Sequence, residues 1–145
     1  MPTMQQSIVP IQFYLSDAPA APGGAQLPPI GLPDVVDVGG VLMPFTGTIV
    51  GCVVQCKNAA GDTVTALPQV SNTALMGSPV AANSLSTPVT NAVQNNSTLV
   101  SKDQADAQFT SGQYVGVKYT TTTGGTYTVF DLLVTLYIST GRTDL

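Results

Sequence analysis

The sequence contains no histidine, no tryptophan and no glutamate. All eight of its acidic residues are aspartates, and only four lysines and arginines accompany them among 145 residues. Histidine is the commonest general base and the commonest neutral metal ligand, so its absence removes the usual centres of acid–base and metal chemistry. The sequence therefore offers no catalytic, metal-binding or cofactor-binding set. We expect a protein that is not an enzyme and that functions through assembly.

Charge of either sign is scarce. Charged residues make up 8% of the chain and the net charge is −4, whereas about 25% is usual for globular proteins. The four cations, Lys57, Lys102, Lys118 and Arg142, are scattered, and binding to nucleic acid needs clustered positive charge. We expect no nucleic-acid partner. A surface rich in uncharged polar residues suits close, lasting protein contact and favours symmetric self-association.

Long apolar runs are also missing, although 43% of the residues are hydrophobic and the mean hydropathy is +0.27. The chain is too apolar to be disordered, yet no run approaches the roughly 20 residues of a membrane-spanning helix. The opening residues 1–6 carry none of the basic residues of a secretory signal. We expect one folded domain, made in the cytosol, with no membrane partner.

The two cysteines, Cys52 and Cys56, lie in residues 48–56, which are predicted to form a strand. At about 3.3 Å per residue their Cα atoms would be about 13 Å apart, beyond the roughly 7 Å that a disulfide allows. Their even spacing places both thiols on one face with Val50 and Val54. We expect buried, reduced cysteines, with an intersubunit disulfide or a metal site as the alternatives.

Two pairs of carboxylates are spaced three residues apart: Asp34 with Asp37, and Asp103 with Asp106. Such pairs could clamp calcium or act as an acid and a base, but neither has the ordered companions of a calcium loop. A glycoside hydrolase would need two carboxyl groups and an aromatic sugar platform, and the chain has no tryptophan to form one. We interpret the pairs as solvated loop acids.

Residues 1–44 differ from the rest because they contain eight of the eleven prolines. Proline removes amide donors and favours extended backbone, which predicts an extended arm over 1–44 ahead of a β-domain over 45–145. The arm holds an apolar segment that must pack on its own domain, as a first strand, or on a neighbouring subunit. Its candidate contact residues are Ile8, Val9, Ile11, Phe13, Tyr14 and Leu15.

From residue 45 the pattern is typical of an all-β protein. Strands are predicted at 48–56, 63–67, 114–119 and 127–139, with turns at 57–62 and 120–126 and with loops and short strands between 71 and 98. Short strands at this spacing indicate an antiparallel β-sandwich of jelly-roll type.

The last predicted strand is apolar on both faces. Phe130, Leu132, Val134, Leu136 and Ile138 alternate with Val129, Asp131, Leu133, Thr135 and Tyr137. We expect the first set to lie in the core. The second set is partly apolar, which indicates burial against another subunit, so Val129, Leu133 and Tyr137 are the candidate trimer contacts.

The order of these features resembles the trimeric jelly-roll domains of tailed-bacteriophage capsid decoration (cement) and head-fibre proteins. The resemblance covers about two thirds of the chain. It comprises the proline-rich arm, Phe45–Gly51, Asn58–Thr65, Ala107–Val117 and Asp131–Ile138, as a pattern of strands and turns without a motif for capsid binding.

The resemblance implies a structural protein without cofactors. It implies a homotrimer that binds the major capsid protein on the outer capsid surface of the virion after synthesis in the host cytoplasm, and that stabilises contacts between capsid subunits, with the arm as a candidate contact. The alternatives are a receptor- or carbohydrate-binding module of a phage fibre or baseplate, and an adhesin-like sandwich of a bacterial surface.

Overall fold

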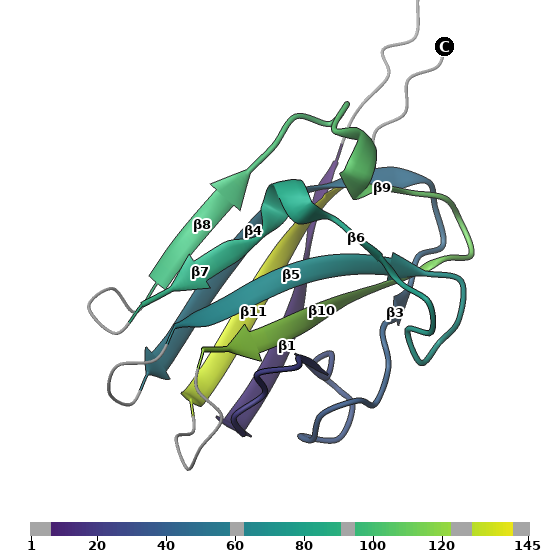
Figure 1. Cartoon of the computed structure of the whole chain (residues 1–145). Coiled ribbons are helices and arrows are strands. Elements are labelled where there is room, and N and C mark those ends of the chain that lie inside the picture. Colours follow the sequence, from purple (N-terminus) through teal and green to yellow (C-terminus); the bar gives the residue numbers. More distant parts are fainter. Residues whose placement is uncertain (1–6, 59–62, 91–94, 123–128, 141–145) are drawn as a thin grey trace, which may run out of the picture.

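The computed structural model describes residues 7–58, 63–90, 95–122 and 129–140. Two antiparallel sheets pack face to face, so the predicted all-β sandwich is confirmed (Figure 1). The first sheet contains β1 (Ile8–Ala18), β11 (Val129–Ser139), β4 (Gly47–Asn58), β8 (Asn95–Leu99) and β9 (Gln108–Phe109). The second contains β2 (Ala25–Gln26), β3 (Val41–Leu42), β10 (Tyr114–Thr121), β5 (Val64–Ser71), β6 (Val80–Ala81) and β7 (Thr87–Val89). Two short 3₁₀ turns, η1 (Asn83–Leu85) and η2 (Ala105–Ala107), complete the described elements.

The strand order is that of a jelly roll. In the first sheet the order is β1-β11-β4-β8, with β9 also paired to β4. In the second sheet β2 and β3 pair with one side of β10, β5 with its other side, and β6 and β7 with β5. The chain therefore crosses repeatedly between the two sheets, as in the double-sheet roll expected from the sequence.

The core lies between the two sheets and is formed by alternate residues of each long strand. Leu132, Val134, Leu136 and Ile138 of β11 are fully buried, as the alternation predicts. Cys52 and Cys56 are buried and unbridged, which confirms the expectation for both. Burial raises the pKa of the Cys52 thiol to about 11.

The segment Ile8–Ala18 is the edge strand of the first sheet, paired with β11 from Ile8 opposite Ser139 to Ala18 opposite Val129. Phe13 and Leu15 are almost completely buried in the core of their own sandwich. Of the two alternatives for this segment, Phe13 and Leu15 follow the first, a strand of their own domain, and they are therefore not available as contacts with a neighbour. β2 and β3 also pair with β10. Residues 1–44 therefore contribute β1 to the first sheet and β2 and β3 to the second.

Pro10 is compatible with this strand because of the side of the strand on which its nitrogen lies. The amides of Tyr14 and Ser16 donate away from β11, to the Pro28 carbonyl at 3.1 Å and to Asp34 Oδ1 at 3.0 Å. Pro10 is an even number of residues from Tyr14 and Ser16, so its nitrogen also faces away from β11 and no bond to β11 is lost. This is the position in which a sheet tolerates proline.

A β-bulge near the start of β11 reverses which side chains face the core. Phe130 pairs with Lys57 and Leu133 pairs with Gln55, so β11 holds one residue more than β4 over this stretch. Asp131 has a left-handed φ of 51°. As a result Val129 is 1% exposed and Phe130 is 40% exposed. This corrects two expectations, Phe130 as a core residue and Val129 as a trimer contact, because a shift of one residue changes the face.

Some expectations fall on parts of the chain that lie outside the described residues. These are 59–62 and 123–126 of the predicted turns, 91–94 of the predicted loop region, and Tyr127 and Thr128 of the predicted last strand. Among the described residues, no helix has both the length and the apolar character needed to cross a membrane.

Candidate functional site

Among the described residues, no group of three or more Cys, Asp, Glu or His side chains could hold a metal ion. The carboxylates instead hold loops in place. Asp34 accepts hydrogen bonds from Ser16 N–H at 3.0 Å and from Ser16 Oγ at 2.6 Å. Asp106 accepts in the same way from Ser84 N–H at 2.8 Å and Oγ at 2.5 Å. The serine hydrogen bonds lower the pKa of both carboxyl groups.

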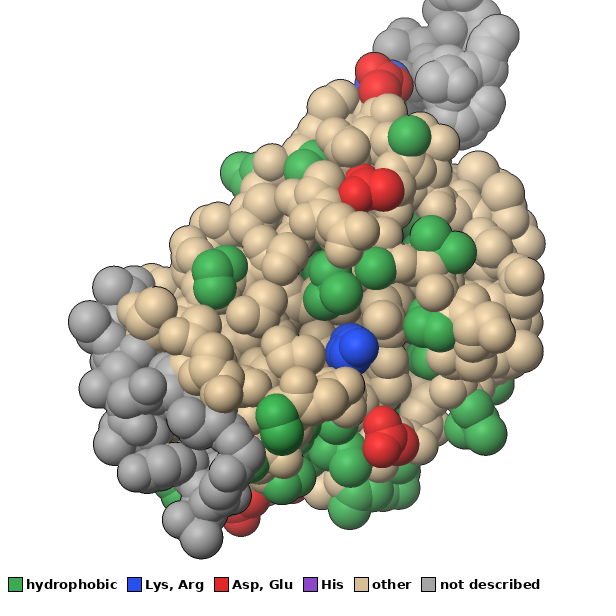
Figure 2. All heavy atoms as spheres, in the orientation of Figure 1, with side chains coloured by type: hydrophobic (Ala, Val, Ile, Leu, Met, Phe, Trp, Pro, Cys, Tyr) green, Lys and Arg blue, Asp and Glu red, His purple; other side chains and the backbone are tan. Residues whose placement is uncertain are grey.

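The outer face of the second sheet is partly covered by the chain itself. Met76 is 4% exposed and lies over Gly116 of β10, where an added Cβ would approach Met76 Cε to 2.9 Å. The loop that carries Met76 is held by a bond from Ser71 Oγ to the Gly77 carbonyl at 2.6 Å. Figure 2, seen from the side on which β5 and β10 lie, shows isolated charged side chains among mostly uncharged atoms.

The outer face of the first sheet lies on the opposite side of the sandwich, and it forms the candidate site. The face consists of side chains that point away from the core on four neighbouring strands, arranged in rows by the strand register. We define the outer face by these rows: Pro10, Tyr137, Gly51 and Leu99; Gln12, Thr135, Val53 and Ser97; Tyr14, Leu133, Gln55 and Asn95; and Asp17, Phe130 and Lys57.

The rows are linked by contacts across the strands. Gln12 Nε2 donates to Thr135 Oγ1 at 3.3 Å. At Gly51 an added Cβ would lie 3.0 Å from Leu99 Cδ2 and 3.3 Å from Tyr137 Cδ2, so glycine lets these two side chains approach each other. Leu99 is nevertheless 75% exposed. A solvated sheet face normally carries polar and charged residues, and the first three rows of this face carry no charge.

Charge is confined to one end of the outer face. Asp17 on β1 and Lys57 on β4 both pair with Phe130, which lies between them on β11. Asp131, in the bulge, accepts a hydrogen bond from Tyr14 Oη at 2.6 Å. This bond and the surrounding carboxylates raise the pKa of the Tyr14 hydroxyl. The acidic groups therefore lie on the β1 and β11 side of the face, and the cation lies on the β4 side.

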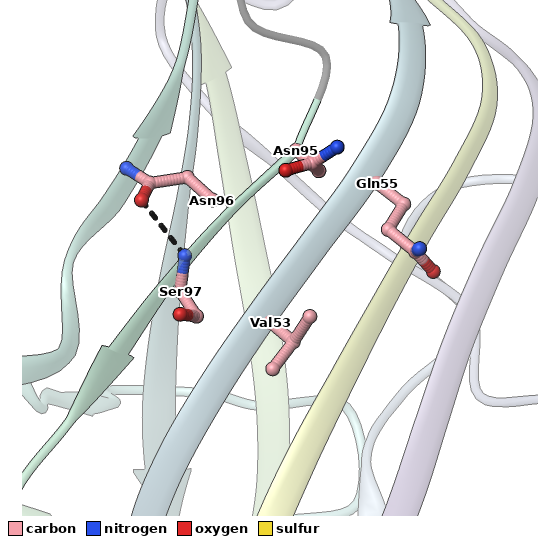
Figure 3. A pocket seen from close by; sticks show the side chains of 5 residues that line it. All are labelled: Val53, Gln55, Asn95, Asn96 and Ser97. Atoms are coloured by element: carbon pink, nitrogen blue, oxygen red, sulfur yellow. Dashed lines mark hydrogen bonds between the residues drawn. The ribbon is translucent and has the colours of Figure 1, made fainter.

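A shallow hollow interrupts the outer face between β4 and β8 (Figure 3). Its volume is about 280 Å³ and it is lined by Val53, Gln55, Asn95, Asn96 and Ser97. Asn96 Oδ1 accepts from Ser97 N–H at 2.8 Å, and its Nδ2 donates to the Pro88 carbonyl at 2.8 Å. Those two bonds fix Asn96 at the sheet edge and leave Gln55, Asn95 and Ser97 exposed beside the hollow.

The predicted contact residues divide between the core and the surface. Ile8 is 54% exposed and Val9 is 37% exposed at the open end of β1, and Ile11 is half-buried beside the core. Tyr14, Leu133 and Tyr137 are half-buried and share the outer face. Sequence reasoning missed the contribution of β8 and of Val53 and Gln55, because the strand register that brings them beside β11 carries no local signal.

The fold is similar to that of a chain in a solved structure described as the capsid of Ralstonia phage GP4. The two chains share 17% sequence identity with a TM-score of 0.58, and the match covers 99% of this chain and 90% of the other. At this identity the likeness concerns the fold, which extends over nearly the whole of both chains. No protein-family model and no curated protein sequence matches the chain.

Proposed function

We propose that this protein is a capsid decoration (cement) protein. It binds the outer surface of a viral head as a homotrimer and stabilises contacts between major capsid proteins. The observation that carries the proposal is the fold similarity to a chain of a phage capsid, which extends over 99% of this chain. A fold alone does not define a function, so the surface chemistry supplies the rest of the support.

The surface favours a binding role over catalysis. The described residues contain no cluster of metal-ligating side chains, and the carboxylates Asp34 and Asp106 are occupied by serine hydrogen bonds. The outer face of the first sheet is instead uncharged in three of its rows, as suits a surface buried in a lasting complex. This supports a non-enzymatic, structural protein.

The charge balance supports an outer location in the virion. The net charge of −4 disfavours contact with packaged DNA, because both carry negative charge. The end of β1, at Ile8 and Val9, is an exposed apolar part of the predicted arm and can contact a capsid protein. We therefore assign the capsid contact to the surface around Ile8 and Val9, and the self-contact to the outer face.

Purified heads of the virus that encodes the chain test this function. The chain is stripped from the heads, added back, and the melting temperature of the shell is measured. A ligand that binds only the assembled shell stabilises it by about 2.7 kcal/mol per site at about 100 times its dissociation constant, so rebinding should raise the melting temperature. A shell whose melting is unchanged at saturation would contradict the cement function.

A matched pair of variants locates the contact. Ile8→Asp should weaken rebinding to the heads, because it places a charge in the proposed apolar contact. Leu75→Asp is the control, since Leu75 is similarly exposed, at 73%, but lies in the loop over the second sheet. Recovery of the chain in tail fractions, with binding to host cells or glycans, would instead support a receptor-binding module.

A further inference from the structure

The outer face carries two pairs of complementary features. In each pair, one member lies on the β1 side of β11 and the other lies on the β4 side. The first pair is ionic. Asp17 on β1 and Lys57 on β4 lie in the same row, separated by Phe130. Two strand spacings put their Cα atoms about 10 Å apart. The two charges of opposite sign therefore lie at the same height on the two flanks of the face.

The second pair is complementary in shape and consists of the hollow and the Tyr14 side chain. The hollow between β4 and β8 spans the rows that contain Gln55 with Asn95 and Val53 with Ser97. On the other flank these same rows end in Tyr14 and Gln12. The Tyr14 ring is held in position by the 2.6 Å bond from its hydroxyl to Asp131. One flank thus presents a fixed aromatic side chain, and the other presents a depression at the same height.

We propose that copies of this chain pack through the outer face around an axis parallel to β11. A rotation about such an axis keeps every row at its own height, so the β1 flank of one copy meets the β4–β8 flank of the next. Asp17 then faces Lys57 of the next copy, and Tyr14 and Gln12 face its hollow. The inference rests on the proposed homotrimer and assigns its interface.

This arrangement places the central strand on the axis. Phe130, Leu133, Thr135 and Tyr137 are the outer-face residues of β11, and together they supply the apolar centre of the contact. Uncharged and aromatic side chains are the usual residues of an interface core, with charges at its edge. The ion pair formed by Asp17 and Lys57 falls at one end, where the face is most polar.

An identical copy is the occupant that the charges favour. Carboxylates lie on the β1 and β11 side, at Asp17 and Asp131, and the cation lies on the β4 side, at Lys57. Each flank therefore finds its opposite charge on the other flank of an identical molecule, at the same height. A closed ring of copies satisfies all of these pairs at once.

Cysteine cross-linking tests the interface in the full-length protein. In the double variant Asp17→Cys, Lys57→Cys, the separation of about 10 Å within one chain exceeds the roughly 7 Å limit for a disulfide. Oxidation should therefore join different copies and give covalent species of two and three chains on a non-reducing gel. The native Cys52 and Cys56 are buried and should not contribute.

The matched control pairs Asp17→Cys with Lys118→Cys, because Lys118 lies on β10 of the second sheet. It should remain monomeric on the gel. Equal cross-linking of the control, or no cross-linking where light scattering shows an assembled protein, would overturn the interface and leave the homotrimer standing. Cross-linking of a protein that fails to bind heads would overturn the cement function and leave the interface standing.

A charge exchange supplies a second measurement that needs no oxidation. Asp17→Lys alone should weaken association about tenfold, because three attractive pairs become repulsive and each exposed pair contributes only modestly. Adding Lys57→Asp to the same chain should restore association, since the pair is then reversed. Equal weakening in the single and double variants would contradict the pairing.

Discussion

At the scale of single residues, the face that each side chain of β11 occupies is set by the bulge at Asp131. Val129 belongs to the core and Phe130 to the outer face, the reverse of simple alternation. A continuous strand of apolar residues gives no sign of where an extra residue enters. The alternation from Leu132 to Ile138 was therefore predictable from the sequence, and the positions before the bulge were not.

The bulge leads us to expect that Val129 contributes more to the stability of the monomer than Phe130 does. Val129→Ala should lower the free energy of unfolding by about 2 kcal/mol, because it removes buried methyl groups and leaves a cavity. Phe130→Ala, although it removes a larger side chain, should lower the stability of the monomer by less than Val129→Ala does, because the ring is 40% exposed and its removal leaves no closed cavity. Urea denaturation of both variants below the concentration of assembly checks this order. The reverse order would place Phe130 in the core.

A second prediction at this scale concerns acid stability. Hydrogen bonds from Ser84 hold the folded-state pKa of Asp106 below its ordinary value of 3.8. A lowered folded-state pKa stabilises the protein above the unfolded value, and this contribution is lost as pH falls through the folded-state pKa. Asp106→Asn should therefore reduce stability near neutral pH by about 0.5–1 kcal/mol, with a smaller difference below pH 4.

Denaturation midpoints measured from neutral to acidic pH test this expectation. Asp103→Asn is the matched control, since it removes a carboxylate from the same loop without removing the bonds to Ser84. A difference between wild type and Asp106→Asn that grows on acidification would contradict the role given to this carboxylate.

At the scale of elements, the sequence allowed the strands to be located better than their partners. The predicted strands at 48–56 and 114–119 fall within β4 and β10, and the one at 63–67 overlaps β5 from Val64 onward, because alternating apolar residues are a local signal. The composition of the outer face depends on which strands are neighbours. The placement of the proline-rich segment in the sheets depends on the same pairing. β1 was interpreted as part of an arm because the prolines of residues 1–44 are visible in the sequence, whereas the edge position that tolerates Pro10 is not.

The position of β1 predicts the effect of removing it. Deleting residues 1–16 would take Phe13 and Leu15 out of the core and expose the edge of β11. Removing a buried phenylalanine or leucine side chain each costs about 2–5 kcal/mol, which together approach the whole stability of a domain. We expect the truncated chain to lose its cooperative thermal transition, as followed by circular dichroism.

Phe13→Ala gives the corresponding point variant and should remain folded but melt at a lower temperature. Ile8→Ala is its control, because Ile8 is more than half exposed and should leave the transition almost unchanged. A truncated chain that melts as cooperatively as the full chain would show that β1 contributes little to the core.

At the scale of the whole molecule, the scarcity of charge predicts how assembly responds to salt. Only one row of the outer face contains charged side chains, so screening should remove only the small contribution of exposed ion pairs. We expect self-association measured by light scattering to weaken only slightly between low salt and about 1 M. The Asp17→Lys variant should respond in the opposite direction, because salt screens its repulsion. Steep dissociation of the wild type would contradict an apolar interface.

The two outer edges of the first sheet, along β1 and β8, bear on how the molecule behaves at high concentration. Pro10 lacks an amide proton on one edge, and on the other the Asn96 side chain already occupies the Ser97 amide. An unblocked edge is a template on which further strands add without limit, the route to fibrils. With both edges obstructed, copies concentrated on one surface can associate through their faces but not grow by strand addition. The first sheet is thereby protected against amyloid-like polymerisation when copies are concentrated.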